Sequence, residues 1–195
     1  MRKVLVTGGA GYVGSHTLQA LKTQGYQQVC FDNLSTGYRE FVGDAPFIQG
    51  DLKHEADLDA AFSRQDITAV MHFASHALVE ESWRTPHKYY HDNIVNTLNL
   101  LEAMRRHSVP LIVFSSSCAT YGIPDRVPID ETMPLDPLQP YGVTKMVIER
   151  ILRDYQNAHG LRFVSLRYFN AAGAAQDGSI GEWHIPESHL IPRLL

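Results

Sequence analysis

The chain has 195 residues, of which 44% are apolar and 19% are charged, and its formal net charge at pH 7 is -4. This composition excludes disorder as the main state, and the length fits about one to one-and-a-half domains. The mild negative charge excludes a dedicated nucleic-acid or anionic-membrane binder, and two cysteines are too few for a disulfide scaffold. The apolar run after Met1 is too short for a secretory signal, and no run reaches the roughly 18 apolar residues of a membrane helix. These exclusions predict a soluble cytoplasmic protein.

Short apolar runs alternate with amphipathic stretches along the chain. Several runs are apolar on successive residues, which suits parallel strands covered on both faces. The expected strands are Lys3–Thr7, Gln28–Phe31, Pro46–Gln49, Ala69–Phe73, Leu111–Ser115 and Arg162–Leu166. Apolar residues at three- and four-residue steps predict helices over Tyr12–Thr23, Glu55–Arg64, Thr85–His107 and Tyr141–Ala158. This alternation predicts a three-layer α/β fold with a doubly wound parallel sheet of the Rossmann type.

Two long irregular segments, Ser116–Pro140 and Asn170–Pro186, follow the fifth and sixth predicted strands. Loops of this length are uncommon without a purpose, and open α/β sheets bind ligands at the carboxyl ends of their strands. We therefore expect a binding cleft at this edge. Residues 1–169 are predicted to form the dinucleotide-binding domain, and residues 170–195 the start of a second, substrate-binding region.

The first strand runs into a glycine-rich turn that carries Gly8, Gly11 and Gly14. At the junction of a strand and a helix, such glycines permit a tight turn, close approach of a pyrophosphate and close helix packing. The free N–H groups at the helix start then hold the anion. The alternative is a glycine-rich surface turn, but the strand–turn–helix context favours dinucleotide binding.

Asp32 ends the second predicted strand, about 20 residues beyond the glycines, as a dinucleotide fingerprint requires. A carboxylate there accepts hydrogen bonds from the adenosine ribose and repels a 2′-phosphate, which favours NAD over NADP. The alternative for Asp32 is a turn-forming acid before Asn33. Asp51, after the third strand, either reaches the adenine amino group or caps the following helix.

Tyr141 and Lys145 lie one turn apart at the head of the fourth predicted helix and therefore share a face. A phenol is a poor base at neutral pH, and a phenolate there requires roughly 4 kcal/mol of stabilisation. A nearby ammonium and the cationic nicotinamide of NAD can supply it. Tyr141 is then predicted to take a proton from a sugar hydroxyl. The alternative is an ordinary pair on a helix surface.

Ser115, Ser116 and Ser117 end the fifth predicted strand at the same edge. One of these hydroxyls can bond the reacting oxygen, and a polar strand end explains the other two. Asn93 is a candidate for ordering water or Lys145. A buried asparagine that satisfies backbone groups explains Asn93 about as well.

Ten histidines raise the question of a metal site. The pairs His72/His76 and His87/His91 have no cysteine or carboxylate near them in a ligand pattern, so no metal is expected. Cys118 lacks a local histidine partner and is not expected to be a nucleophile.

Together these motifs resemble the extended short-chain dehydrogenase/reductase family and, within it, the UDP-glucose 4-epimerases. The resemblance covers essentially the whole chain and is carried by residues 7–15, 32–37, 50–52, 115–122, 141–145, 167–170 and 189–192. The glycine turn and the Tyr141/Lys145 pair mark the superfamily, whereas the serine motif and Arg167–Asn170 are closer to the epimerases. The related dehydratases carry Thr-Asp-Glu in place of the three serines, so dehydration is not expected.

The resemblance implies that NAD stays bound while hydride leaves C4 of a UDP-hexose, a transient 4-keto sugar turns over, and hydride returns to the opposite face. It implies that Tyr141 is the acid/base, that Lys145 holds the nicotinamide ribose and tunes Tyr141, and that Ser117 bonds the sugar hydroxyl. The implied substrate contacts are Ser117, Tyr141, Asn170, His189 and Leu190. The implied NAD contacts are Gly8, Gly11, Tyr12, Val13, Gly14, Asp32, Asn33, Ser35, Thr36, Gly37, Asp51, Leu52, Phe73, Ala74, Ala77, Asn93, Lys145 and Phe169. It also implies a homodimer through the helices at 85–107 and 141–158.

Two features depart from the family pattern. Glu80 stands where glycine is usual, near the substrate diphosphate, and its charge is expected to weaken binding of an anion. The family members are also longer, since a further lobe closes over the substrate. The expected helix from about Glu187 would leave an apolar stripe uncovered, which indicates a truncated gene, a shortened chain or a partner surface. The alternatives to epimerisation are therefore a simple NAD-dependent dehydrogenase, or an NAD-binding fold with little or no turnover.

Overall fold

Six parallel strands form one sheet in the order β3-β2-β1-β4-β5-β6 in a computed structural model. The structure describes residues 3–184 with Glu187, Ile191 and Leu194, and only the backbone at residues 64–65. The strands are β1 Lys3–Thr7, β2 Gln27–Asp32, β3 Phe47–Gln49, β4 Ile67–His72, β5 Leu111–Ser115 and β6 Arg162–Leu166. The strand order reverses at β1, which pairs with both β2 and β4. The predicted doubly wound sheet is confirmed, and its ligand edge lies where the order reverses.

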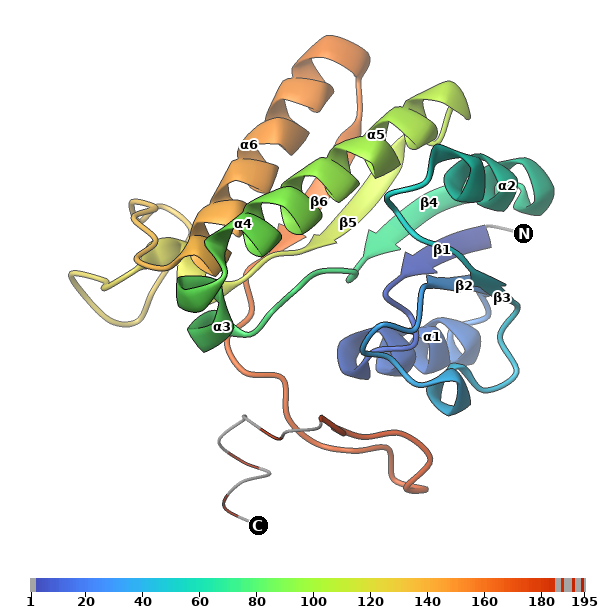
Figure 1. Ribbon diagram of the computed structural model, residues 1–195, viewed down its shortest axis with the longest axis horizontal. Helices are drawn as coiled ribbons and strands as arrows, with labels where there is room; N and C mark the ends of the chain where they lie inside the picture. Colours follow the sequence, from blue (N-terminus) through green and yellow to red (C-terminus); the bar gives the residue numbers. More distant parts are fainter. Residues whose placement is uncertain (1–2, 185–186, 188–190, 192–193, 195) are drawn as a thin grey trace.

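Helices pack on both faces of the sheet (Figure 1). They are α1 Tyr12–Thr23, α2 Glu55–Gln65, α3 Val79–Arg84, α4 Pro86–Tyr89, α5 Asn96–Arg106 and α6 Pro140–His159. Helices α2, α5 and α6 cover one face, and α1 covers the other over β1 and β2. Because side chains alternate along a strand, Leu5 enters the larger core while Val4 and Val6 enter the smaller core under α1.

The prediction of one continuous α-helix over 85–107 is wrong, because a π-helical turn interrupts it. Pro86 occupies the first turn, where its missing N–H costs little. However, residues Tyr90–Val95 form a π-helical turn between α4 and α5. Helix α3 and the short 3₁₀ turns at Arg39–Val42 and Cys118–Tyr121 were not predicted, because segments this short show little periodicity.

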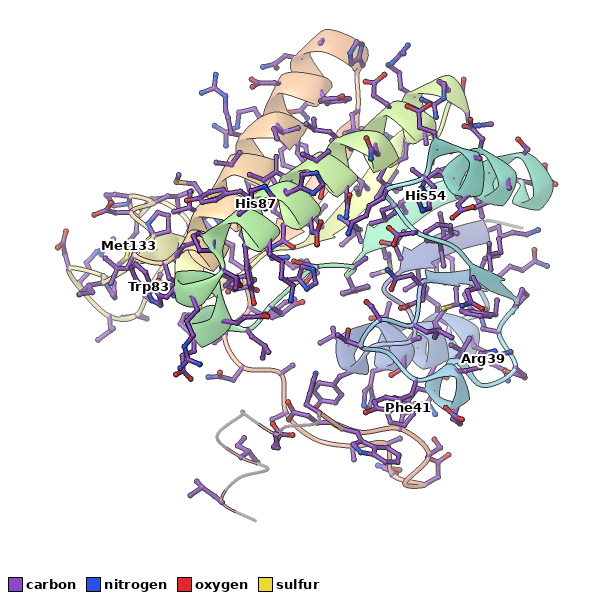
Figure 2. The ribbon with its side chains drawn as sticks, viewed as in Figure 1. Arg39, Phe41, His54, Trp83, His87 and Met133 are labelled. Carbon is purple, nitrogen blue, oxygen red and sulfur yellow. The ribbon has the colours of Figure 1, made fainter. Side chains whose placement is uncertain are left out.

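The segment after β6, residues 170–184, crosses back beneath the carboxyl edge of the sheet toward α1 (Figure 1). We call it the strap. The Tyr12 hydroxyl donates to a strap carbonyl at 2.7 Å, and the Trp183 ring stacks on Tyr38 with 5.0 Å between centroids. Phe41 lies against the strap in Figure 2, with 6.2 Å between its ring centroid and that of Trp183. The strap therefore lies along the carboxyl edge of the sheet, on the side of α1.

None of the helices in the described part of the chain combines the length and the apolar character needed to span a membrane.

Candidate active site

The glycine turn joins β1 to α1 at the carboxyl edge. Gly8 has a φ of +71°, and a Cβ added there would lie 2.4 Å from the Ala74 backbone nitrogen. A Cβ on Gly14 would lie 2.1 Å from the Gly8 carbonyl oxygen, so neither position admits a side chain. At Gly11 the nearest protein atom would be 3.4 Å away, an ordinary contact. Gly11 caps α1 without a side chain, which leaves the first N–H groups of the helix available to an anion.

Asp32 is buried at the end of β2 and holds two backbone groups. Its Oδ2 accepts from the Ala10 N–H at 3.0 Å, and its Oδ1 accepts from the Leu34 N–H at 2.8 Å. Burial raises the pKa of this carboxyl, and the two backbone bonds oppose that rise. Asp32 therefore does form a turn, through its bond to the Leu34 N–H. Its bond to the Ala10 N–H also connects the end of β2 to the glycine turn.

Asp51 does not cap α2, whose N-cap is His54. Its Oδ1 accepts from the Lys53 N–H at 2.9 Å, and its Oδ2 accepts from the Asn33 side-chain amide at 3.0 Å. The N-cap alternative is wrong because three residues separate Asp51 from the first helical residue. Asp51 and Asn33 instead join the ends of β3 and β2 beside the cleft.

The three serines at the end of β5 have three different partners. Ser115 is hydrogen-bonded to the Tyr168 hydroxyl, and the Ser116 hydroxyl donates to the buried carboxylate of Glu149. Ser117 caps the 3₁₀ turn that follows it. Two serines therefore anchor the strand end, and the third lines the same cleft as Tyr141.

Tyr141 and Lys145 are buried, with 9% and 2% of their surfaces exposed, so the surface-pair alternative is wrong. The Lys145 ammonium donates to the Ser115 carbonyl at 2.9 Å and lies 5.6 Å from the centroid of the Tyr141 ring. Burial lowers the pKa of Lys145 to about 7. Burial also raises the pKa of Tyr141 to about 12, against the hydrogen bond with Ser117. The protein by itself therefore keeps the phenol protonated, and Lys145 does not supply the predicted lowering alone.

Asn93 satisfies backbone groups rather than bonding Lys145. Its Oδ1 accepts from the His76 N–H at 2.9 Å, and its Nδ2 donates to the His76 carbonyl at 3.1 Å. The same Nδ2 contacts the Thr144 hydroxyl at 3.2 Å, next to Lys145 in α6. Asn93 is thus linked to the Tyr141/Lys145 helix through one neighbour.

These groups meet in one cleft of about 1030 Å³ at the carboxyl edge of the sheet. All the predicted cofactor residues line it, as do Ser117, Tyr141 and Asn170. The predicted substrate contacts His189 and Leu190 lie outside the described residues. Residues distant in sequence are brought together because parallel strands end at one edge.

Residues 4–194 match the model of the NAD dependent epimerase/dehydratase family. The chain belongs to this family.

Relatives at high identity are longer than this chain. A UDP-glucose 4-epimerase of Rhizobium leguminosarum bv. trifolii is 50% identical over 189 residues, which cover 97% of this chain and 58% of the relative. The structure of UDP-glucose 4-epimerase from Brucella ovis in complex with NAD matches with a TM-score of 0.97 and 50% identity, over 99% of this chain and 59% of that one. The enzyme from Bifidobacterium longum in complex with NAD+ and UDP has a TM-score of 0.89 and 38% identity, over 92% and 57%. The chain therefore spans somewhat more than half the length of these relatives.

In this epimerase/dehydratase family member the cleft also has lining residues that the sequence did not single out for binding. Some, such as Lys53, Ser75 and Tyr168, lie beside a predicted residue near a strand end, which is the signal that would have found them. These lining residues include Lys53, Ser75, His76, Val79, Lys88, Asp92, Asn96, Cys118, Ala119, Gly122, Pro124, Ile129, Gln139 and Tyr168.

Glu80 does not line the cleft. Its carboxylate pairs with the Arg84 guanidinium at 2.6 Å on the exposed side of α3. Its negative charge is therefore locally balanced, and the expected weakening of anion binding stays a prediction.

The histidine pairs have partners of other kinds. His72 is buried between the hydroxyls of Thr7 and Thr97, and His87 stacks on His91. Burial lowers the pKa of His72 to about 3, so this imidazole is neutral.

A carboxylate–imidazole group that no sequence spacing indicated lies near the end of the strap. Ligand atoms of Glu182, His184 and Glu187 lie within 4.8 Å of one another. Such groups are common on surfaces without an ion, so the geometry alone assigns no metal.

Replacing Lys145 by methionine is expected to raise the free energy of unfolding by about 1–4 kcal/mol near neutral pH, because no amine is then desolvated. The folded-state pKa of about 7 lies below the ordinary 10.5, so unfolding takes up a proton between these values. The contribution of Lys145 to the free energy of unfolding of the unaltered chain therefore falls as the pH is lowered from 10.5 to 7. The gain in the variant should be larger at pH 7 than at pH 10.

Urea unfolding of both proteins at the two pH values measures this difference. Lys22→Met, at an exposed lysine that pairs with Asp44, is the control and should show no such pH-dependent gain. An equal gain from Lys145→Met at both pH values would contradict the burial argument.

Proposed function

We propose that this chain binds NAD and carries the acid/base group for 4-epimerisation of a UDP-hexose, UDP-glucose or UDP-galactose. The observation that carries the proposal is the presence of Tyr141, Ser117 and Lys145 in the same cleft as the glycine turn and Asp32. Membership in the NAD dependent epimerase/dehydratase family supports it, as do the relatives named as UDP-glucose 4-epimerases.

The residues present fit an adenine dinucleotide. The glycine turn is built where a Cβ at Gly8 or Gly14 would strike backbone, and the start of α1 faces the same cleft. The N–H groups of this helix start would hold the pyrophosphate, and Asp32 would accept from the adenosine ribose. Asp51 and Asn33 lie where the adenine end would rest. When bound, NAD would supply the oxidation and reduction of the sugar carbon.

The chain's own groups would handle the proton. Tyr141 Oη would accept the proton of the sugar hydroxyl as the 4-keto sugar forms and return it afterwards. Ser117 would hold the same oxygen. Because burial raises the pKa of Tyr141 to about 12, positive charge beyond that of the protein must favour the phenolate, and the nicotinamide cation is the natural source. Lys145 would position the nicotinamide ribose, and Asn170 would contact the substrate.

Two other functions stay open for the chain by itself, since it spans 58% of the length of the Rhizobium relative. One is an NAD-binding fold with little or no turnover, and the other is a simple NAD-dependent dehydrogenase. A coupled assay for conversion of UDP-galactose to UDP-glucose separates them. Formation of UDP-glucose without net NADH supports epimerisation, and net NADH supports a dehydrogenase. Absence of both products supports the binding fold.

Calorimetry with NAD tests the cofactor independently of turnover. The unaltered chain is expected to bind NAD, and Gly11→Ala to weaken binding at least about tenfold, because the added Cβ points into space that the pyrophosphate needs. Gly11→Ala should leave the unfolding midpoint nearly unchanged, since the nearest protein atom is 3.4 Å from that Cβ. Absence of NAD binding by the unaltered chain would contradict the proposal.

The assembly belongs to the same proposal. A homodimer through residues 85–107 and 141–158 remains a prediction, which sedimentation velocity can test. The domain division at residue 169 and a cytoplasmic location also remain predictions. Helices α5 and α6 run beside each other on one face of the sheet, which would allow a paired interface (Figure 1).

A further inference from the structure

The π-helical turn at Tyr90–Val95 directs two successive residues at one loop. The loop connects β4 to α3 and comprises residues 73–78; we call it the β4–α3 loop. Asn93 holds the backbone of His76 in this loop at both its N–H and its carbonyl. Asp92 holds the side chain of the same residue, with 2.9 Å between its Oδ2 and the His76 Nε2. Single π turns of this kind commonly occur at functional sites.

Asp92 also reaches a second segment of the cleft wall. Its Oδ1 lies 3.1 Å from the Lys53 ammonium, which belongs to the turn before α2, and 3.0 Å from Nδ1 of His91. Burial opposes ionisation of Asp92, but the bonds from His91, His76 and Lys53 outweigh it and lower the pKa of this carboxyl to about 2. One carboxylate therefore connects three elements while it remains ionised.

The groups of this cluster face the cleft. Lys53, His76, Asp92 and Asn93 all line it, although no motif marks Lys53, His76 or Asp92 for cofactor binding. The β4–α3 loop starts against the glycine turn, because the Phe73 and Ala74 N–H groups donate to the Thr7 carbonyl at 2.9 and 3.1 Å. The position of this loop therefore sets how far the wall at His76 stands from the glycine turn.

We propose that Asp92 is a positioning residue for the dinucleotide, which acts through His76 and Lys53 to hold the β4–α3 loop and the turn before α2 at the spacing that NAD requires. The inference rests on one part of the proposed function, the binding of NAD, and is independent of turnover. Asp92 is not a catalytic residue, since its carboxylate is bonded to His76, His91 and Lys53 rather than to the Ser/Tyr/Lys group. Removing its charge should loosen two walls of the cleft together.

The test measures NAD affinity by calorimetry and NAD release by stopped flow. Asp92→Asn is expected to raise the dissociation constant and the dissociation rate about three- to tenfold, which lies in the lower part of the range of coupling for groups in one network. His76→Ala should have a similar effect, and the double variant should be no worse than either single variant. His76→Gln should recover part of the loss, because its amide can still donate to Asp92. Lys53→Met should cause a smaller loss.

Asp59→Asn is the matched control. Asp59 also bonds an imidazole and a cation, with 2.9 Å to His107 Nε2 and 3.0 Å to Arg106 Nη2, but it does not line the cleft. Asp59→Asn and Asp92→Asn should lower the unfolding midpoint comparably, whereas only Asp92→Asn should weaken NAD binding.

Three results overturn the positioning role while the proposed function stands. They are NAD binding by Asp92→Asn equal to that of the unaltered chain, additive losses in the double variant, and an equal loss of affinity in Asp59→Asn. Failure of the unaltered chain to bind NAD overturns both proposals.

Discussion

Tyr141→Phe is expected to reduce conversion of UDP-galactose to UDP-glucose about 10²- to 10⁴-fold, the usual contribution of a positioned acid/base group. The substitution removes one oxygen from a buried ring and leaves the ring's volume and packing in place. NAD affinity should remain within about twofold, because the phenol oxygen lies on α6 and the anion site lies on α1. The unfolding free energy should fall by no more than about 1.5 kcal/mol, the value of one hydrogen bond.

The control is Tyr155→Phe in the same helix. The Tyr155 hydroxyl donates to Glu102 at 2.7 Å and does not line the cleft. This variant loses a comparable hydrogen bond, so turnover should stay near the unaltered rate. Turnover by Tyr141→Phe equal to that of Tyr155→Phe would remove Tyr141 from the proposed mechanism. If the unaltered chain shows no turnover, the same pair is compared in a chain of the relatives' length.

Glu149→Ala is expected to cost about 3–5 kcal/mol of unfolding free energy, which is a large part of the total for a domain of this size. The Glu149 carboxylate accepts from Arg167 Nε at 2.9 Å and from Nη2 at 2.6 Å, and it also accepts from the Ser116 hydroxyl. The side chains of Glu149 and Arg167 are only 10% and 17% exposed. Removal of the carboxylate therefore leaves a guanidinium with little access to water and one remaining partner, the Tyr121 hydroxyl at 2.9 Å.

Asp154→Ala is the control on the same helix. Asp154 pairs with Arg150 at 3.1 Å, but both side chains are more than half exposed, so the loss should stay below about 1 kcal/mol. Urea unfolding of the two variants compares a buried pair with an exposed one. A loss from Glu149→Ala as small as that from Asp154→Ala would mean that water reaches Arg167. Because Ser116 and Tyr121 flank the Ser117 segment, turnover should fall with stability.

Local pattern was enough to predict the strands, most of the helices and the parallel sheet. Runs such as Leu111–Ser115 are apolar on successive residues, which only a strand covered on both faces tolerates. The glycine turn was equally readable, because part of its requirement is local: a Cβ at Gly14 would strike the carbonyl of Gly8, six residues away. Asp32 was identified as a cofactor residue from its distance to that turn, and it does line the cleft.

Contacts across the fold decided what single residues do. Spacing alone could not tell which serine faces the cleft, although the family resemblance implied Ser117. The choice depends on Tyr168, after β6, and Glu149, from α6, which bind the other two serines. Burial similarly decided the ionisation of Tyr141 and Lys145, since the pKa of a side chain depends on water that neighbouring elements exclude.

The cluster around Asp92 shows the same division between local and distant information. The sequence alone determined a Rossmann sheet with a dinucleotide edge, because periodicity and glycine spacing act over a few residues. Only the tertiary structure joined Lys53, His76 and Asp92, which come from three separate segments of the chain. Their attraction depends on distances set by how β4, α2 and the π-helical turn pack, and no spacing along the chain encodes those distances.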